Sequence, residues 1–203
     1  MRTHVRRTLT RRRGERGGAM VEFAFVLPLL TLFAFGAIEM GLAWSGRLTV
    51  QTAVRAGVRV GSAQGTVANA DQVLLVSTGA ALNDLGLANV NSVVVFKSIT
   101  IDGAVPTACL TGTPHSVSGS CNAYTGAQLA QVVAGTSPGS WFGCGVGSLD
   151  LSWCPTSRQA IQALGNDYLG VWVSARHPML TGFFGSTLTI VDHAVMRLEP
   201  KET

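Results

Sequence analysis

Residues 23–38 read FAFVLPLLTLFAFGAI, sixteen positions without a charged side chain. The apolar run continues to Trp44 and is broken only by Glu39. A helix over this run of roughly 22 residues measures about 33 Å at the standard rise per residue. That length is enough to cross the hydrocarbon core of a bilayer. The segment therefore predicts a single membrane-spanning helix near the N-terminus.

Charge is unevenly distributed along the 203 residues. The first sixteen positions hold seven of the fifteen basic side chains and one acid, whereas the rest of the chain has a net charge of −2. Because basic residues stay on the cytoplasmic side of a membrane helix, we expect an N-terminus in the cytoplasm and a body outside it. The basic segment has no interleaved aromatic residues, so nucleic-acid binding does not explain it.

Two export signals are alternatives to a retained anchor. A secreted protein would be cut near Ser45, where Ala43-Trp44-Ser45 offers a small-x-small site, and Thr10-Arg11-Arg12 can be read as part of a twin-arginine signal. The apolar run is longer than the core of 7–15 residues that is usual for a secretory signal. The arginine cluster also lacks the rest of a twin-arginine pattern. We therefore favour an anchor.

An acidic residue stands at the cytoplasmic mouth of the apolar run. Glu22 has Phe25 and Val26 at the i+3 and i+4 positions, so no basic neighbour on its own helix can pair with it. A carboxylate at that depth is costly unless it is paired. A cut between Gly17 and Gly18 would free an amine on a neighbouring subunit that could neutralise it. The same cut would remove all seven arginines of the N-terminal segment.

The residues around this acid resemble those of a known family. Arg16-Gly17, a few small residues and Val21-Glu22-Phe23 precede Val26-Leu27-Pro28-Leu29-Leu30. This arrangement is similar to the TadE-like pilins, the minor pilins or pseudopilins of the tight-adherence (Flp-type) pilus machinery. The resemblance covers residues 16–61 and includes two further segments, Gly36-Ala37-Ile38-Glu39-Met40-Gly41 and Val54-Arg55-Ala56-Gly57-Val58-Arg59; a weaker similarity lies in residues 194–200.

The resemblance implies a structural pilus subunit and not an enzyme. A prepilin peptidase would cut after Gly17, or after Gly18 because the glycine is doubled, and Glu22 with Phe23 would guide assembly. The expected partners are other pilin and pseudopilin subunits, the peptidase and membrane lipid. The expected domains are a basic cytoplasmic leader (1–17), a transmembrane and extended helix (18–61) and an exported body (62–203).

Smaller features of the helix indicate how it packs. Ala37, Gly41 and Ser45 recur every four residues and form a small-residue stripe that would let another helix approach closely. We expect Glu39 to be solvated near the outer headgroups, with pairing to Arg47 or a partner pilin as the alternative. Arg55 and Arg59 are spaced i, i+4, and we expect both to face water.

The body reads as an α+β domain in which a small antiparallel sheet packs against the N-terminal helix. Residues 62–69 are expected to form a linker, and Asp71 to cap a helix that runs to Leu85 before Gly86. Alternating apolar residues predict strands at 92–101, before an Asp102-Gly103 turn, and at 168–176 and 186–199.

Residues 102–166 are rich in Gly, Ser, Thr and Pro and are expected to form a large irregular insert. All four cysteines, Cys109, Cys121, Cys144 and Cys154, fall in this segment. Disulfides are favoured, because these spacings do not match the short C-x₂₋₄-C pairs of structural zinc sites. Of the three possible pairings, the nearest-neighbour one closes two short loops worth about 2–3 kcal/mol each.

Several residue patterns match catalytic or metal-binding motifs in spacing but lack the groups or the context that the chemistry needs. Residues 135–139 read GTSPG and match G-x-S-x-G, but Pro138 has no N–H to donate to an oxyanion. Gly143, Gly145 and Gly147 lack the strand–helix context of a phosphate loop. His177 and His193 can meet across a hairpin beside Asp192, without a defined third ligand. We therefore expect no metal, no cofactor and no catalytic residue.

Overall fold

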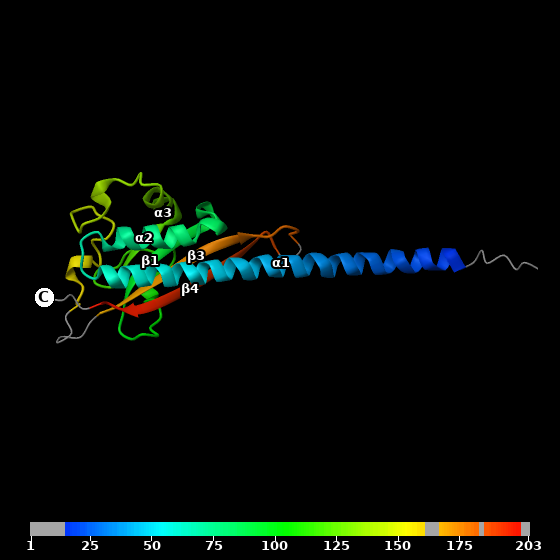
Figure 1. Ribbon diagram of the computed structural model, residues 1–203, viewed down its shortest axis with the longest axis horizontal. Helices are drawn as coiled ribbons and strands as arrows, with labels where there is room; N and C mark the ends of the chain where they lie inside the picture. Colours follow the sequence, from blue (N-terminus) through cyan, green and yellow to red (C-terminus); the bar gives the residue numbers. More distant parts are fainter. Residues whose placement is uncertain (1–14, 161–166, 183–184, 200–203) are drawn as a thin grey trace, which may run out of the picture. The chain divides into compact units, whose positions relative to one another are not determined.

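The computed structural model describes residues 15–160, 167–182 and 185–199 (Figure 1). The chain divides into two compact units, Met1–Gly41 and Leu42–Thr203. Most of the arginine cluster expected in the cytoplasm lies outside the described residues.

Helix α1 (Glu15–Gln64) is continuous across the predicted membrane segment and the residues that follow it. Gly65 has a φ of +58° and donates its N–H to the Gly61 carbonyl at 3.2 Å, which ends the helix. The predicted linker therefore begins too early, since residues 62–64 belong to the helix. Arg55 and Arg59 are exposed, as expected for two like charges that face water.

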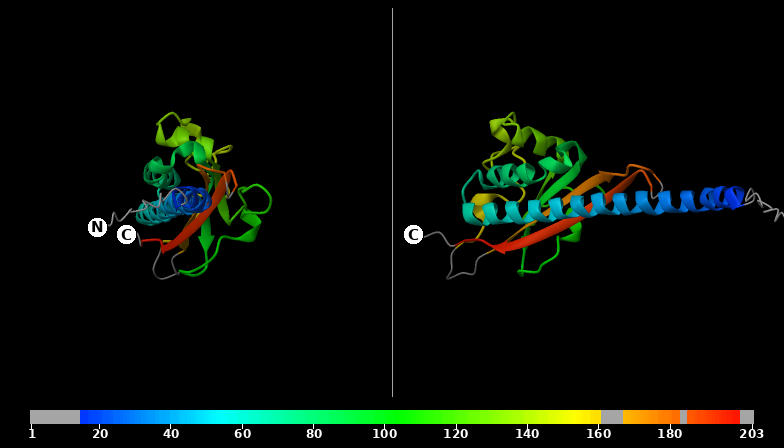
Figure 2. Two further views of the ribbon diagram at one scale, coloured as in Figure 1. Left: turned by 90° about the vertical axis from the view of Figure 1, so that its right-hand side faces the viewer. Right: turned by 45° about the vertical axis from the view of Figure 1, so that its right-hand side comes forward.

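A four-stranded antiparallel sheet forms the centre of the body. Its strands are β1 (Val90–Ser98), β2 (Cys121–Thr125), β3 (Tyr168–Pro178) and β4 (Thr187–Arg197), in the order β2-β1-β3-β4 (Figure 2). The α+β class and the antiparallel sheet are confirmed. The first predicted strand is too long at its C-terminal end, because β1 stops at Ser98 and leaves the side chain of Ile99 87% exposed.

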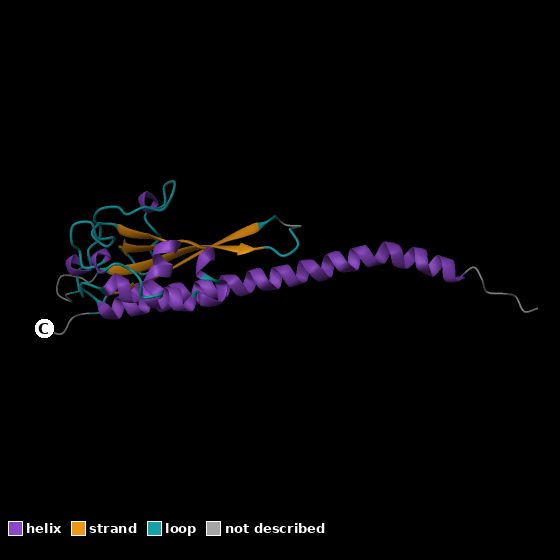
Figure 3. Cartoon of the chain, turned by 90° about the horizontal axis from the view of Figure 1, so that it is seen from above, coloured by secondary structure: helices purple, strands orange, loops and turns teal. Residues whose placement is uncertain are grey.

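Helices cover one face of this sheet and bury the main core. The C-terminal part of α1 contributes Val50, Ala53, Val54 and Val58, while β1 and β3 contribute inward-facing valines at alternate positions, Val93, Val95, Val171 and Val173. Two shorter helices, α2 (Ala70–Ala81) and α3 (Gly126–Val133), add Leu74, Leu75 and Leu129 to the same cluster (Figure 3). The expected packing of the sheet against the N-terminal helix is confirmed.

Glycines let α1 approach its neighbours closely. A Cβ placed on Gly57 would collide with the Thr78 side chain of α2. A Cβ on Gly61 would collide with Leu74 of α2 and Leu169 of β3, both of which are fully buried. Because interiors are packed at near-crystalline density, these neighbours have little room to move. The glycines at these two positions therefore set how near α1 can lie to the body.

We expect Gly61→Ala to destabilise the body even though alanine favours helix formation. The added methyl group must displace two buried leucines, and overpacking of this kind costs about 1–3 kcal/mol. The measurement is the free energy of unfolding in denaturant. Gly41→Ala is the matched control, because a Cβ there meets no atom within 4 Å. Equal stability of the two variants would contradict the packing argument.

The predicted irregular insert contains regular structure that the sequence reading missed. Strand β2 pairs with β1 from Ser92↔Thr125 to Phe96↔Cys121, and α3 follows it at once. The start of α3 is a capping box, in which Thr125 Oγ1 accepts from Gln128 N and Gln128 Oε1 accepts from Thr125 N. The insert therefore supplies an edge strand and a helix of the core.

Both expected disulfides are present. Cys109 pairs with Cys121 and Cys144 with Cys154, which is the nearest-neighbour pairing. The first bridge ties the loop after β1 to the start of β2, within the smaller core cluster of the opposite sheet face. The second closes a turn in which Asp150 accepts hydrogen bonds from the backbone of Gly143 and Cys144. Each bridge therefore restrains a segment that has little regular structure of its own.

Asp71 is not a helix cap. The N-cap of α2 is Asn69, which makes no side-chain cap bond, and the helix ends at Ala81, followed by short 3₁₀ turns at Asn83–Leu85 and Leu87–Asn89. The Asp71 carboxylate is fully buried and forms an ion pair with Arg158 Nη2 at 2.6 Å. A helix is therefore present where it was predicted, but its predicted end at Leu85 is wrong, and so is the role predicted for its first acid.

Three parts of the insert converge on this carboxylate. Asp71 Oδ2 accepts from Asn122 Nδ2 and from the Tyr124 hydroxyl, each at 2.8 Å. The Arg158 guanidinium also stacks over the Trp153 ring at 4.1 Å and donates to the Trp153 carbonyl. Burial and then the nearby Asp71 charge raise the pKa of Tyr124 well above its usual value, so the phenol stays a donor. The network thus fixes the insert to α2.

We expect Asp71→Asn to destabilise the body by about 3–5 kcal/mol, because it leaves the buried Arg158 guanidinium without a counter-charge. The free energy of unfolding is again the measurement. Asp102→Asn, a change at an exposed acid, should remain within about 0.5 kcal/mol of the parent protein. A loss below about 1 kcal/mol for Asp71→Asn would show that the ion pair does not hold the insert in place.

Candidate functional site

The apolar side chains of residues 20–38 form a helical surface that is exposed in the structure. Twelve large apolar side chains between residues 20 and 38 are exposed around the whole helix: Met20, Val21, Phe23, Phe25, Val26, Leu27, Leu29, Leu30, Leu32, Phe33, Phe35 and Ile38. Phe25 is the most open of them, at 78% exposed. The distribution is not amphipathic, so the surroundings of this segment must be apolar on every side.

The size of this surface excludes water as its working environment. Covering each large apolar side chain is worth about 1.5–3 kcal/mol, so twelve together represent on the order of 20 kcal/mol. That exceeds the whole stability of a typical domain, about 5–15 kcal/mol. The span Gly17–Gln64 contains a stretch long and apolar enough to cross a membrane, and none of that stretch is buried in the protein. A membrane anchor and a signal sequence both fit this finding, whereas a buried core helix does not.

The polar groups inside the apolar surface are satisfied locally. Thr31 Oγ1 donates to the carbonyls of Leu27 and Pro28, at 2.8 and 2.9 Å. A threonine that turns its hydroxyl back onto its own helix hides it from lipid. Pro28 lies inside the helix and cannot donate to the carbonyl four residues earlier, an interruption that bilayer helices tolerate. Residues 23–38 are therefore compatible with hydrocarbon throughout.

The predicted processing and assembly residues occupy the first turns of α1. Gly17 and Gly18 are exposed, and a Cβ on either would meet no atom within 4 Å. Glu22 is also exposed, and no ion pair joins it to any residue that the structure describes. Phe23 stands beside it, 60% exposed. The fold thus leaves all four residues open to a protease or to a second chain.

The small-residue stripe is open as well. Ala37, Gly41 and Ser45 are exposed on α1. Glu39, which lies between Ala37 and Gly41 in the sequence, was expected to be solvated. This expectation is wrong, because Glu39 is only 2% exposed. The alternative partner Arg47 instead lies over the ring of Trp44, at 6.0 Å from its centroid. An aromatic and cationic pair at this position suits the outer membrane interface.

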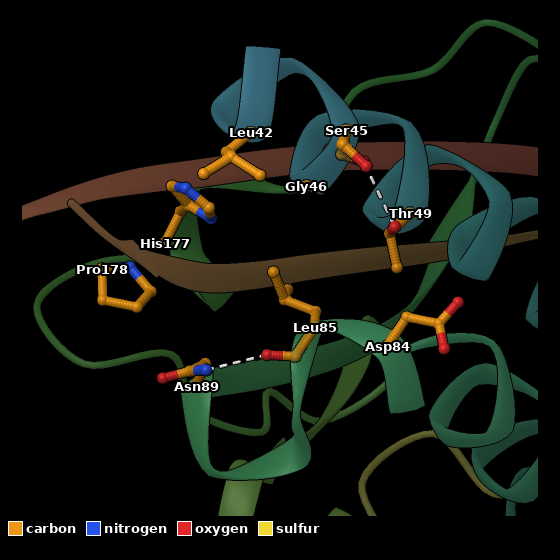
Figure 4. A pocket seen from close by; sticks show the side chains of 9 residues that line it. All are labelled: Leu42, Ser45, Gly46, Thr49, Asp84, Leu85, Asn89, His177 and Pro178. Atoms are coloured by element: carbon orange, nitrogen blue, oxygen red, sulfur yellow. Dashed lines mark hydrogen bonds between the residues drawn. The ribbon is translucent and has the colours of Figure 1, made fainter. Parts of the chain in front are cut away.

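A small pocket lies in the body where α1 passes the turn end of the β3–β4 hairpin. Its volume is about 270 Å³, and Figure 4 shows its nine lining residues: Leu42, Ser45, Gly46, Thr49, Asp84, Leu85, Asn89, His177 and Pro178. Leu42 and Leu85 supply apolar walls, whereas Asp84 and Asn89 supply polar groups. The sequence analysis did not find this pocket, because its walls come from three segments distant in sequence.

The formal catalytic and metal motifs do not assemble. In the β3–β4 register His177 lies opposite Leu188, whereas His193 lies opposite Trp172, five positions away. Residues 135–139 follow α3 and lead into a 3₁₀ turn, so the serine is not on a strand-to-helix elbow. The described part of the chain also brings together no group of three metal-ligating side chains. The two histidines therefore do not share a site.

Comparison with known proteins gives one match. The family model described as TadE-like protein matches residues 17–59, which lie entirely within α1. No curated protein and no solved structure matches the chain significantly. The resemblance noted in the sequence is thus confirmed for the N-terminal segment, residues 17–59, which is similar to the TadE-like proteins. The matched residues include the exposed apolar surface, Glu22 and Gly57.

Proposed function

We propose that this TadE-like chain is a minor pilin or pseudopilin of a tight-adherence pilus, processed by a prepilin peptidase and assembled through α1. One observation carries the proposal: the family match falls on the helix segment whose apolar surface no part of the protein covers. While the protein is in the membrane, lipid covers that surface. In an assembled filament, the helices of neighbouring subunits cover it. The function is structural, and no step of it requires a cofactor.

The first step is removal of the basic leader. An aspartic prepilin peptidase hydrolyses the bond after Gly17, water adds across that bond, and the new chain begins with the Gly18 amine. The leader holds the arginines that keep the N-terminus in the cytoplasm. Cleavage therefore removes the basic segment that holds the N-terminus in the cytoplasm, so that the helix can leave the bilayer. A cut after Gly18 would place the new amine one residue nearer to Glu22.

The second step pairs Glu22 with a new amine. The cut after Gly17 makes Glu22 the fifth residue of the mature chain, at the mouth of the apolar segment. An ionised carboxylate is costly there unless an opposite charge lies close to it. The freed amine of a neighbouring subunit supplies that charge and fixes the register between two helices. Ala37, Gly41 and Ser45 then provide a surface on which the helices can approach.

The body, residues 62–203, acts outside the cytoplasm. Two disulfides in a chain of this size fit an oxidising compartment. The basic residues before the apolar helix indicate the same orientation, with the N-terminus in the cytoplasm and the body outside it. In this arrangement the sheet and the insert face other subunits or an external surface, while α1 remains in the membrane until assembly.

The mature protein should begin at Gly18. N-terminal sequencing, together with the intact mass, of protein purified from membranes of cells that carry the pilus machinery tests this directly. Deleting the prepilin peptidase is the control and should restore the full-length chain. A mature start at Met1 would favour a simple bitopic protein with a ligand-binding or enzymatic outer domain. A start at Gly46 would indicate a secreted protein.

Replacing Glu22 with Gln should leave cleavage intact and impair assembly, because the amide keeps the shape but removes the charge that attracts the amine. Co-purification with partner pilins, measured against total membrane protein, gives the readout. Glu199→Gln changes an exposed carboxylate of the body and should have no effect. Wild-type co-assembly of the Glu22 variant would refute the pairing step while leaving the anchor in place.

A further inference from the structure

The hairpin of β3 and β4 lies along the part of α1 that follows Leu42. Strand β3 runs in the opposite direction to the helix. Near the C-terminal end of α1, Ser62 Oγ donates to the Arg197 carbonyl, and the Gly61 backbone packs against Leu169. Fifteen residues earlier on the helix, a Cβ on Gly46 would lie 3.2 Å from Ile190 and 3.4 Å from His177. Strand β3 therefore leads from the far end of the body toward Leu42.

The chain reversal of this hairpin is unusually apolar. We define the hairpin tip as residues 178–182, Pro-Met-Leu-Thr-Gly. Met179 N donates to the Ser186 carbonyl, which extends the pairing one position beyond the strands. Leu180 projects without cover and is 71% exposed. Turns at a protein surface are rich in polar residues, so the open leucine is the feature of this turn that a lipid surface could cover.

The tip lies at the level where α1 changes from apolar to polar. Pro178 lines the same pocket as Leu42, the first residue of the unit Leu42–Thr203 (Figure 4). Immediately after Leu42 come Trp44, which is 62% exposed, and Arg47, which stacks on it. Such a pair marks the headgroup region of a membrane helix. Beyond it the helix surface carries Thr49, Thr52 and Arg55 instead of a continuous apolar surface.

We propose that the hairpin tip is a second membrane contact, which inserts Leu180 into the outer leaflet beside the point where α1 leaves the bilayer. This inference rests on the proposed function, because it takes α1 as a membrane-spanning helix. The hairpin then acts as a stop that seats the body on the lipid surface. The occupant is lipid, not protein, since Pro178 of the tip lines the same pocket as Leu42, which belongs to the apolar run that ends at Trp44.

The charges around the tip fit an anionic lipid surface. Arg176 is exposed two residues before Pro178, and Arg47 is exposed on α1. Cations placed just behind an apolar contact are favourable beside acidic headgroups. One acid, Asp84, lines the pocket and opposes this arrangement. The balance of two arginines to one carboxylate still leaves the side that faces the headgroups positive.

Depth-dependent fluorescence quenching tests the contact in the full chain. Single cysteines are introduced at Leu180, Leu30 and Ile101 and labelled with a polarity-sensitive probe without reduction, so that both disulfides persist. Each variant is reconstituted in vesicles of phosphatidylcholine with a minor share of phosphatidylglycerol. Quenchers are placed near the headgroups or deep in the acyl chains. Ile101→Cys is the matched control, because it replaces an exposed apolar residue beyond Ser98, at the opposite end of the sheet from the tip.

The Leu180→Cys probe should emit at shorter wavelength than the Ile101→Cys probe and lose intensity to the shallow quencher. The Leu30→Cys probe should respond to the deep quencher and so establish the span independently. A responding Leu30 probe with a Leu180 probe that matches Ile101 would overturn the second contact and leave the anchor standing. If the emission of the Leu180→Cys probe is shifted but no lipid quencher reduces its intensity, the tip contacts protein. That result would also overturn the second membrane contact. If the deep quencher does not affect the Leu30→Cys probe, the membrane anchor itself is refuted.

Discussion

The helix α1 has to satisfy two different environments along one continuous run of hydrogen bonds. Up to Gly41 its apolar side chains are exposed on every side, and after Leu42 its small and branched residues are buried against a sheet. A solvent-exposed apolar surface worth on the order of 20 kcal/mol cannot be offset by the stability of one small domain. The segment therefore requires lipid or other helices around it, and the body has to fold in a way that leaves it free.

Close packing at glycines meets this requirement on the body side. Gly57 and Gly61 let α2 and β3 lie directly against α1, so the helix is held by contact along its backbone. The TadE-like match ends at residue 59 and includes Gly57, whereas the sheet and the insert lie outside it. The shared pattern thus covers the surface offered to lipid or partners together with the first contacts to the body.

Local patterns in the sequence predicted those elements whose burial follows from their own residues. The long apolar run, the alternating strands β3 and β4, and the pairing of near cysteines are of this kind. Strand β2 and helix α3 were missed because they span only five and eight residues, and because their burial comes from β1 and α2. Asp71 was misread for a related reason. A capping acid and the partner of a buried arginine look identical locally, and Arg158 lies 87 residues away. The open leucine of the hairpin tip was likewise hidden in a segment that reads as an ordinary Pro- and Gly-containing turn.

Two carboxylates on α1 bear on the assembly role that we propose. Glu39 interrupts the apolar run, yet the folded chain leaves it only 2% exposed. Glu22 is exposed, and within the described residues no cation pairs with it. A simple anchor gains nothing from an acid at the mouth of its span, since any apolar residue there would insert more favourably. In the proposed function, the acid at this position gains its partner when the amine released by cleavage of a neighbouring subunit arrives, after the leader has been removed.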